Sequence, residues 1–117
     1  MREDGKIDYV EFPAQDLAAL RDFYGAAFGW RFQDYGPSYA AFEDSGLDGG
    51  FDADESARPV RPLVILYAAE LEAMERKVRG AGGVITKAIF SFPGGRRFHF
   101  RDPSGNELAV WSDAPAP

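Results

Sequence analysis

Two glutamates and one histidine are the side chains of this sequence with the most evident capacity for acid–base chemistry. Glu11 follows Tyr9 by two positions in an apolar stretch, so both side chains lie on the same face of a strand. A carboxylate buried among apolar groups has a raised pKa and can bind a cation or abstract a proton. Glu11 is therefore our one candidate catalytic residue, with a carboxylate at a sheet edge or interface as the alternative, and the catalytic set stays unknown.

His99 and Glu107 each allow a structural and a functional interpretation. His99 is the single histidine of the chain and, by strand alternation, faces away from Phe98 and Phe100. A lone histidine on a strand is more often structural than a ligand or a base. Glu107 shares a strand face with Trp111 and is a candidate ligand-binding residue. The alternative interpretation is a solvated charge beside a turn. The sequence holds no cysteine, which excludes thiolate zinc sites and cysteine nucleophiles.

The overall charge argues against two classes of partner. The net charge is −6, and the chain has no basic cluster beyond Arg96 and Arg97. Nucleic acids and anionic membranes both require many lysines and arginines, so we expect neither as a partner. No apolar run reaches membrane-spanning length, and the charged stretch from Arg2 to Asp4 is unlike a secretory leader. We expect a soluble, cytoplasmic protein.

The elements that carry these residues follow one pattern twice. Each half has a strand, an amphipathic helix and three further strands. In the first half these are Ile7–Phe12, a helix after the N-cap Asp16 that Gly29 ends, and strands at about 30–34, 38–43 and 47–51. In the second they are Leu63–Tyr67, a helix after Glu70 that ends before Gly82 and Gly83, and strands at about 84–87, 89–100 and 107–111, with a tight turn at Pro93-Gly94-Gly95 inside the second of these. The helix stripe of Leu17, Leu20 and Tyr24 recurs 54 residues later as Leu71, Met74 and Val78.

This repeat predicts an α+β fold in a single domain, residues 1–117, with repeat halves at about 7–52 and 62–112. Paired βαβββ modules would form a curved eight-stranded mixed sheet with the helices on the outer face. The inner, concave face is where a small ligand would lie. The predicted ligand-binding residues are Tyr9, Glu11, Phe51, Tyr67, Glu107 and Trp111. Their aromatic rings suit flat or cationic ligands, or else belong to the core.

The motifs of this pattern resemble the vicinal oxygen chelate superfamily of glyoxalases, bleomycin resistance proteins and extradiol dioxygenases. The resemblance rests on Ile7 to Pro13, Asp16-Leu17, Phe23-Tyr24, Phe28-Gly29-Trp30, Ala81-Gly82-Gly83 and Phe100 to Asn106. It covers the chain from about Ile7 to Trp111 and implies the paired βαβββ fold, commonly as a homodimer. It is not specific to one activity.

The chain departs from that superfamily where metal-dependent members bind a divalent ion. The resemblance implies four ligands, one on the first strand and one on the last strand of each half. Those positions here are Tyr9, Gly50, Leu63 and Ala109. None has a good donor for zinc, nickel or manganese. We therefore expect no metal and no cofactor.

Three functional hypotheses remain open. The first is metal-independent binding of an apolar or aromatic small molecule, for example to sequester it. The second is a metal-dependent lyase, isomerase or dioxygenase of glyoxalase type that uses displaced ligands such as Glu11, Glu107 or His99. The third is a non-catalytic structural or regulatory subunit. The sequence identifies neither the ligand nor whether the protein is an enzyme, and it leaves open whether the halves pair within one chain or swap between two.

Overall fold

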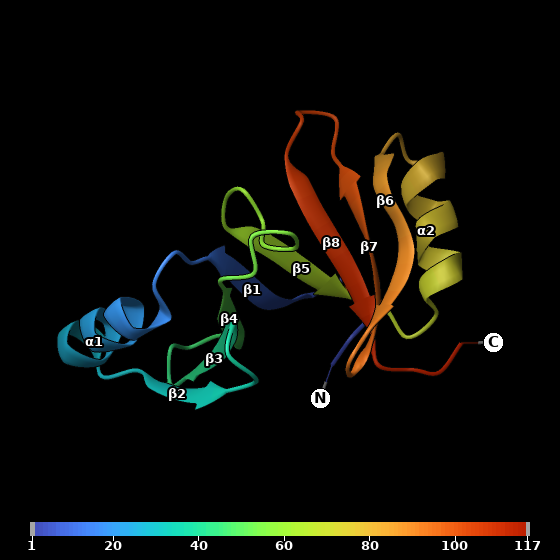
Figure 1. Ribbon diagram of the computed structural model, residues 1–117. Helices are drawn as coiled ribbons and strands as arrows, with labels where there is room; N and C mark the ends of the chain where they lie inside the picture. Colours follow the sequence, from blue (N-terminus) through green and yellow to red (C-terminus); the bar gives the residue numbers. More distant parts are fainter. Residues whose placement is uncertain (1, 117) are drawn as a thin grey trace. The chain divides into compact units, whose positions relative to one another are not determined.

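Two units, each with one helix and a group of strands, make up the protein. The computed structural model describes residues 2–116. The first unit comprises residues 9–63, and the second comprises residues 2–8 with 64–116. The elements in chain order are β1 Ile7–Pro13, α1 Leu17–Phe28, β2 Arg31–Asp34, β3 Tyr39–Glu43, β4 Gly49–Asp52, β5 Leu63–Tyr67, α2 Leu71–Gly80, β6 Val84–Phe92, β7 Gly95–Arg101 and β8 Glu107–Ser112 (Figure 1).

The strand pairing confirms the predicted α+β class and its mixed sheet. The first half has the order β2-β3-β4-β1 and the second half has the order β5-β8-β7-β6. In each half the first strand runs parallel to the last one, β1 with β4 and β5 with β8. The other pairs in each half are antiparallel. Both halves therefore repeat one connectivity, as the internal repeat predicts.

Local sequence signals set the bounds of α1. The Asp16 side chain accepts a hydrogen bond from the backbone N–H of Ala19 at 3.2 Å, which satisfies a donor that the helix start leaves without an intrahelical partner. Gly29 follows the helix with φ of 74°, a left-handed conformation that glycine adopts without a steric penalty. The predicted N-cap and stop signal are both confirmed.

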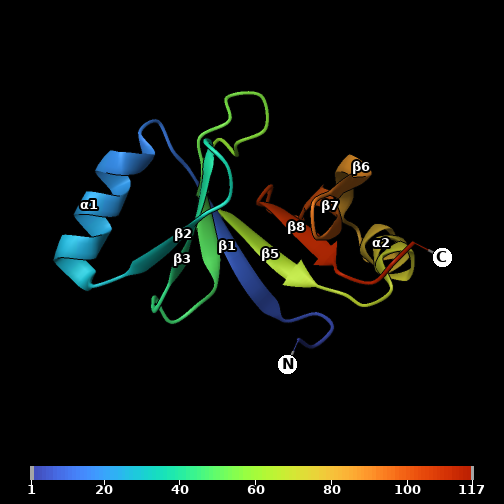
Figure 2. The ribbon, with the colours of Figure 1, turned by 60° about the horizontal axis from the view of Figure 1, so that its bottom comes forward.

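Each unit buries one face of its strands under its own helix. In the first unit, Val10 and Phe12 of β1 pack with Leu17 and Leu20 of α1. In the second unit, α2 packs against a core of buried residues, and Figure 2 shows each helix along one side of its own strands. The buried members of that core are Ala68, Leu71, Phe98, Phe100 and Val110. The opposite face of each group of strands carries the alternate residues, and we call it the helix-free face.

Two predicted strands have different bounds in the structure. Residues 84–87 and 89–92 are one continuous strand, β6, which has register shifts against β7 on both sides of Lys87. Such irregularities bend a strand without ending it, so the break in the apolar pattern did not mark a turn. Strand β4 begins at Gly49 instead of Leu47, because the Ser45 hydroxyl bonds to the backbone of Leu47 in the preceding turn. No helix in residues 2–116 is long and apolar enough to cross a membrane.

Two glycines of the second unit should respond to alanine in opposite directions. A Cβ at Gly95 would lie 2.3 Å from the backbone oxygen of Ser112, whereas a Cβ at Gly80 meets nothing within 4 Å. We expect Gly95→Ala to lower the free energy of unfolding by about 1–3 kcal/mol, because strands β7 and β8 must separate locally. The matched control Gly80→Ala should raise it by roughly 0.5–1 kcal/mol, because alanine favours helix. Urea denaturation followed by circular dichroism measures both, and a neutral Gly95→Ala would contradict the β7–β8 pairing.

Candidate functional site

A chain of hydrogen bonds links three side chains on the helix-free face of the first unit. The Tyr39 hydroxyl donates to Glu11 Oε2 at 3.1 Å, and the Tyr9 and Tyr39 hydroxyl oxygens are 2.5 Å apart. Tyr9 and Glu11 come from β1, and Tyr39 is the first residue of β3. Glu11 is only 4% exposed, so its carboxylate depends on protein donors for the hydrogen bonds that water would otherwise supply.

Gly50 leaves the space into which the Tyr39 side chain extends. It pairs with Glu11 on one side and with Ala41 of β3 on the other, so Tyr39, two residues before Ala41, reaches it diagonally. A Cβ at Gly50 would lie 2.4 Å from Tyr39 Oη and 2.6 Å from two ring carbons. Any side chain at this position would therefore displace the ring that donates to Glu11.

Burial keeps both phenols of this chain neutral. It raises the pKa of Tyr9 to about 12, and the negative charges of Glu11 and Asp48 act in the same direction, while the hydrogen bond between Tyr9 and Tyr39 opposes them. Burial and the charge of Glu11 also raise the pKa of Tyr39. At neutral pH both hydroxyls therefore act as hydrogen-bonding groups and not as phenolates.

The helix-free face of the second unit carries two aromatic rings whose polar atoms are both engaged. Tyr67 and Trp111 meet edge to face with ring centroids 5.6 Å apart. The Tyr67 hydroxyl donates to Asp113 Oδ1 at 2.6 Å, and Trp111 Nε1 donates to Asp8 Oδ2 at 2.9 Å. These anchors fix the rings. Tyr67 is 8% exposed, and the guanidinium carbon of Arg2 lies 4.9 Å from the centroid of the Trp111 ring.

His99 is a buried, neutral residue on the same face of the second unit. Its side chain is paired across the strands with Ala109 and is 5% exposed. Its pKa is lowered to about 4, mainly by burial and also by the positive charges of Arg97 and Lys87, while Glu107 opposes these effects. Its Nδ1 lies 3.6 Å from Glu107 Oε2. Its Nε2 is buried and has no hydrogen-bond partner within residues 2–116.

Comparison with known proteins assigns the family. The model of the Glyoxalase/Bleomycin resistance protein/Dioxygenase superfamily matches residues 6–110. The chain belongs to this superfamily. No curated protein sequence matches it.

Solved structures of quite different description share the fold of this superfamily member. A methylmalonyl-CoA epimerase from Mycobacterium tuberculosis has a TM-score of 0.71 at 17% identity, with 99% of this chain and 91% of that chain covered. An NAD-dependent benzaldehyde dehydrogenase from Legionella pneumophila has a TM-score of 0.74 at 18% identity, with coverages of 89% and 96%. A Mn(II)-bound glyoxalase from Novosphingobium aromaticivorans has a TM-score of 0.66 at 23% identity, with coverages of 100% and 43%. These likenesses show the fold, and function has to be argued from the site.

The residues at the four positions that the resemblance assigns to metal ligands do not fit a divalent ion. The resemblance places ligands at Tyr9, Gly50, Leu63 and Ala109, and three of these have no donor atom in their side chains. The fourth, Tyr9, is a neutral phenol, which is a weak ligand. Within residues 2–116 no group of three or more His, Cys, Asp or Glu side chains could hold a metal ion. These residues therefore provide no basis for a metal-dependent step.

Most of the predicted ligand-binding residues lie on the helix-free faces, but one does not. Tyr9 and Glu11 lie there in the first unit, and Tyr67, Glu107 and Trp111 in the second. The prediction for Phe51 is wrong. Phe51 is 1% exposed in the core under α1, with ring centroids 5.2 Å from Phe42 and 5.4 Å from Tyr24. Gly50 and Phe51 are consecutive in a strand and must face opposite ways, so both could not belong to one face.

Sequence reasoning missed Tyr39, and it considered Arg97 only as part of the basic pair Arg96 and Arg97. Tyr39 stands one residue before Ala40, which is fully buried on the helix side, so alternation along β3 would have placed its ring beside Glu11. Arg97 pairs with Trp111, and its guanidinium carbon lies 5.5 Å and 5.6 Å from the ring centroids of Phe90 and Phe92. By alternation along β7, Arg97 lies on the same face as His99. The predicted strand at 89–100 combined parts of β6 and β7, which obscured this alternation.

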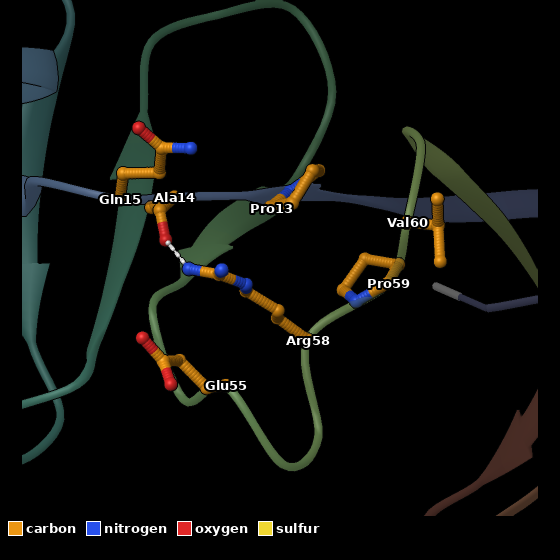
Figure 3. A pocket seen from close by; sticks show the side chains of 7 residues that line it. All are labelled: Pro13, Ala14, Gln15, Glu55, Arg58, Pro59 and Val60. Atoms are coloured by element: carbon orange, nitrogen blue, oxygen red, sulfur yellow. Dashed lines mark hydrogen bonds between the residues drawn. The ribbon is translucent and has the colours of Figure 1, made fainter.

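A pocket of about 530 Å³ lies elsewhere on the first unit, where the connector after β4 passes the end of β1 (Figure 3). Its one guanidinium, that of Arg58, is held by a 2.7 Å hydrogen bond to the backbone oxygen of Ala14. Val60 on its wall is 93% exposed. The pocket has no aromatic wall, and we assign no ligand to it. It is lined by Pro13, Ala14, Gln15, Glu55, Arg58, Pro59 and Val60.

The buried state of His99 predicts a pH dependence of stability. In the unfolded chain the imidazole binds a proton below pH 6.5, whereas in the folded protein it does so only below about pH 4. The unfolded state therefore binds more protons in this window, and stability falls as pH is lowered from about 6.5 to 4, by up to about 3 kcal/mol. Urea denaturation at a series of pH values should show this slope in the native protein and a flatter profile in His99→Gln. An NMR titration midpoint for His99 near 6.5 would contradict the burial.

Proposed function

We propose that this superfamily member binds an apolar or aromatic small molecule without using a metal ion. The observation that carries the proposal is the approach of Tyr39 to Gly50, where metal-dependent relatives would have a ligand. The Tyr39 ring fills the space over Gly50, and its hydroxyl donates a hydrogen bond to Glu11. The first unit therefore has a phenol at the position where a metal site would need a ligand such as a carboxylate. The Glu11 carboxylate thus accepts a hydrogen bond from Tyr39, which is in turn hydrogen-bonded to Tyr9.

The aromatic side chains of the helix-free faces support an aromatic ligand. In the second unit the polar atoms of the Tyr67 and Trp111 rings are both engaged, and the guanidinium of Arg2 over the Trp111 ring shows that this ring accepts a cation. In the first unit Tyr9 is half-buried and supplies a ring together with a neutral hydroxyl. Flat ligands gain both apolar burial and stacking on such surfaces. Sequestration of a toxic compound is one form that this binding would take.

An enzyme that uses Glu11 is the second candidate. Glu11 is a buried carboxylate in a hydrogen-bonded chain, an arrangement that proteins also use to accept protons. This candidate predicts a substrate turned over by the protein and a loss of activity in Glu11→Gln. If the activity also required a metal ion, displaced ligands such as Glu107 would have to bind that ion.

Two further properties belong to the proposal as expectations. We expect a homodimer, as the resemblance to the superfamily implies, and a cytoplasmic location. Sedimentation of the purified protein measures the first, and fractionation of expressing cells measures the second.

Metal content and ligand-induced stabilisation together test the proposal. The protein purified without chelator should contain much less than one divalent metal per chain by mass spectrometry, and added Zn, Ni, Mn or Fe(II) should leave its melting temperature unchanged. Aromatic compounds should raise the melting temperature, because a ligand that binds only the folded state stabilises it.

Two controls separate the candidates. Tyr9→Phe should weaken the binding of aromatic ligands, whereas Phe23→Leu, on the exposed surface of α1, should leave their binding unchanged. About one metal per chain that is lost in Glu11→Gln would contradict the proposal and favour the enzyme. Stabilisation by neither metal nor any aromatic compound would favour a structural subunit.

A further inference from the structure

The protons of the Tyr9–Tyr39–Glu11 chain can be assigned by counting. A tyrosine hydroxyl has one proton to donate and lone pairs with which to accept. The proton of Tyr39 is directed at Glu11 Oε2, which as a carboxylate can only accept. The 2.5 Å contact between the two hydroxyl oxygens therefore needs the proton of Tyr9. The chain runs in one direction, from Tyr9 through Tyr39 to Glu11.

This direction determines what Tyr9 can offer to a ligand. Its only proton is used within the chain, so its remaining hydrogen-bonding capacity is that of an acceptor. Burial and the charge of Glu11 keep this phenol protonated, so it does not gain a second mode of interaction at neutral pH. A ligand group with only acceptor atoms would find no donor at Tyr9, and it would leave a polar atom of the site unpaired.

We infer that the helix-free face of the first unit selects aromatic ligands that carry an O–H or N–H donor, such as phenols, anilines and indoles, and that Tyr9 Oη is the acceptor. The selectivity is set at a distance by Glu11, which fixes the direction of the chain through Tyr39. Tyr9 is the contact residue, and Tyr39 and Glu11 are positioning residues. This inference rests on the proposed binding function and adds the chemical class of the ligand.

A matched pair of probes tests the inference. Dissociation constants for 4-methylphenol and 4-methylanisole are measured by NMR titration at pH 7, where both are neutral. The two differ in that a methyl group replaces the donor proton. The native protein should bind 4-methylphenol about tenfold more tightly, because 4-methylanisole leaves Tyr9 unpaired. 4-Methylaniline, which keeps a donor in place of the hydroxyl, should group with the phenol.

Three variants separate the direction of the chain from mere shape. Tyr9→Phe removes the acceptor, so the preference for the phenol should disappear. Tyr39→Phe keeps the ring over Gly50 but frees the proton of Tyr9, which can then donate to the ether oxygen, so the preference should vanish or reverse. Glu11→Gln places an amide where the carboxylate lay. Because an amide can either donate to Tyr39 or accept from it, the preference should shrink. Circular dichroism melts confirm that each variant is folded, and Glu11→Gln keeps the test available should Tyr39→Phe not fold.

The outcomes distinguish the inference from the function on which it rests. Binding of both probes with equal affinity, or a preference that survives both Tyr39→Phe and Glu11→Gln, would overturn the inference and leave the binding function standing. Binding of none of the aromatic probes would overturn both. A preference that is lost in Tyr9→Phe and relaxed by the other two variants is the expected result.

Discussion

The close approach of a tyrosine ring to a glycine backbone is the constraint on which the candidate site depends. Tyr39 reaches diagonally across the sheet to a position where Gly50 leaves room, and a single methyl group at that position would overlap the ring. The ring in turn brings its hydroxyl to the buried carboxylate of Glu11. The absence of a side chain at Gly50 thus allows the phenol of Tyr39 to lie on the helix-free face of the first unit.

Glu11 makes the arrangement energetically demanding. A carboxylate that is almost fully buried is costly unless its oxygens accept hydrogen bonds, and Tyr39 supplies one of these. The Tyr9 hydroxyl is in turn hydrogen-bonded to the Tyr39 hydroxyl, so the carboxylate and the two phenols form an ordered chain of donors and acceptors. The same side chains therefore offset the burial of a charge and give the surface a fixed hydrogen-bonding direction.

Much of the fold could be predicted because its signals are local or periodic. Asp16 and Gly29 bound α1 by capping chemistry, and the recurrence of the apolar stripe at Leu71 and Met74 predicted the second βαβββ half. The placement of Tyr9 and Glu11 opposite the core followed from strand alternation. What failed was register. Phe51 was assigned to the same face as Gly50, although consecutive residues of a strand face opposite ways, and β6 continues through irregularities that no residue type indicates.

The chemistry of the site was harder to predict, because it comes from a contact between strands. Nothing at Tyr39 or Gly50 marks either residue by itself. Their meaning follows from the pairing of Ala41 with Gly50, which brings the two together. The four metal positions could be listed from the resemblance, but only the structure shows what fills the space that Gly50 leaves.

A double-mutant cycle between residues 39 and 50 tests the central claim most directly. Gly50→Ala is introduced into the native protein and into Tyr39→Ala, and the free energies of unfolding are measured by urea denaturation. If the Tyr39 ring occupies the space over Gly50, the alanine costs about 1–3 kcal/mol in the native protein and much less once the ring is gone. Equal costs in both backgrounds, within about 0.5 kcal/mol, would show that the ring does not lie there and would contradict the account.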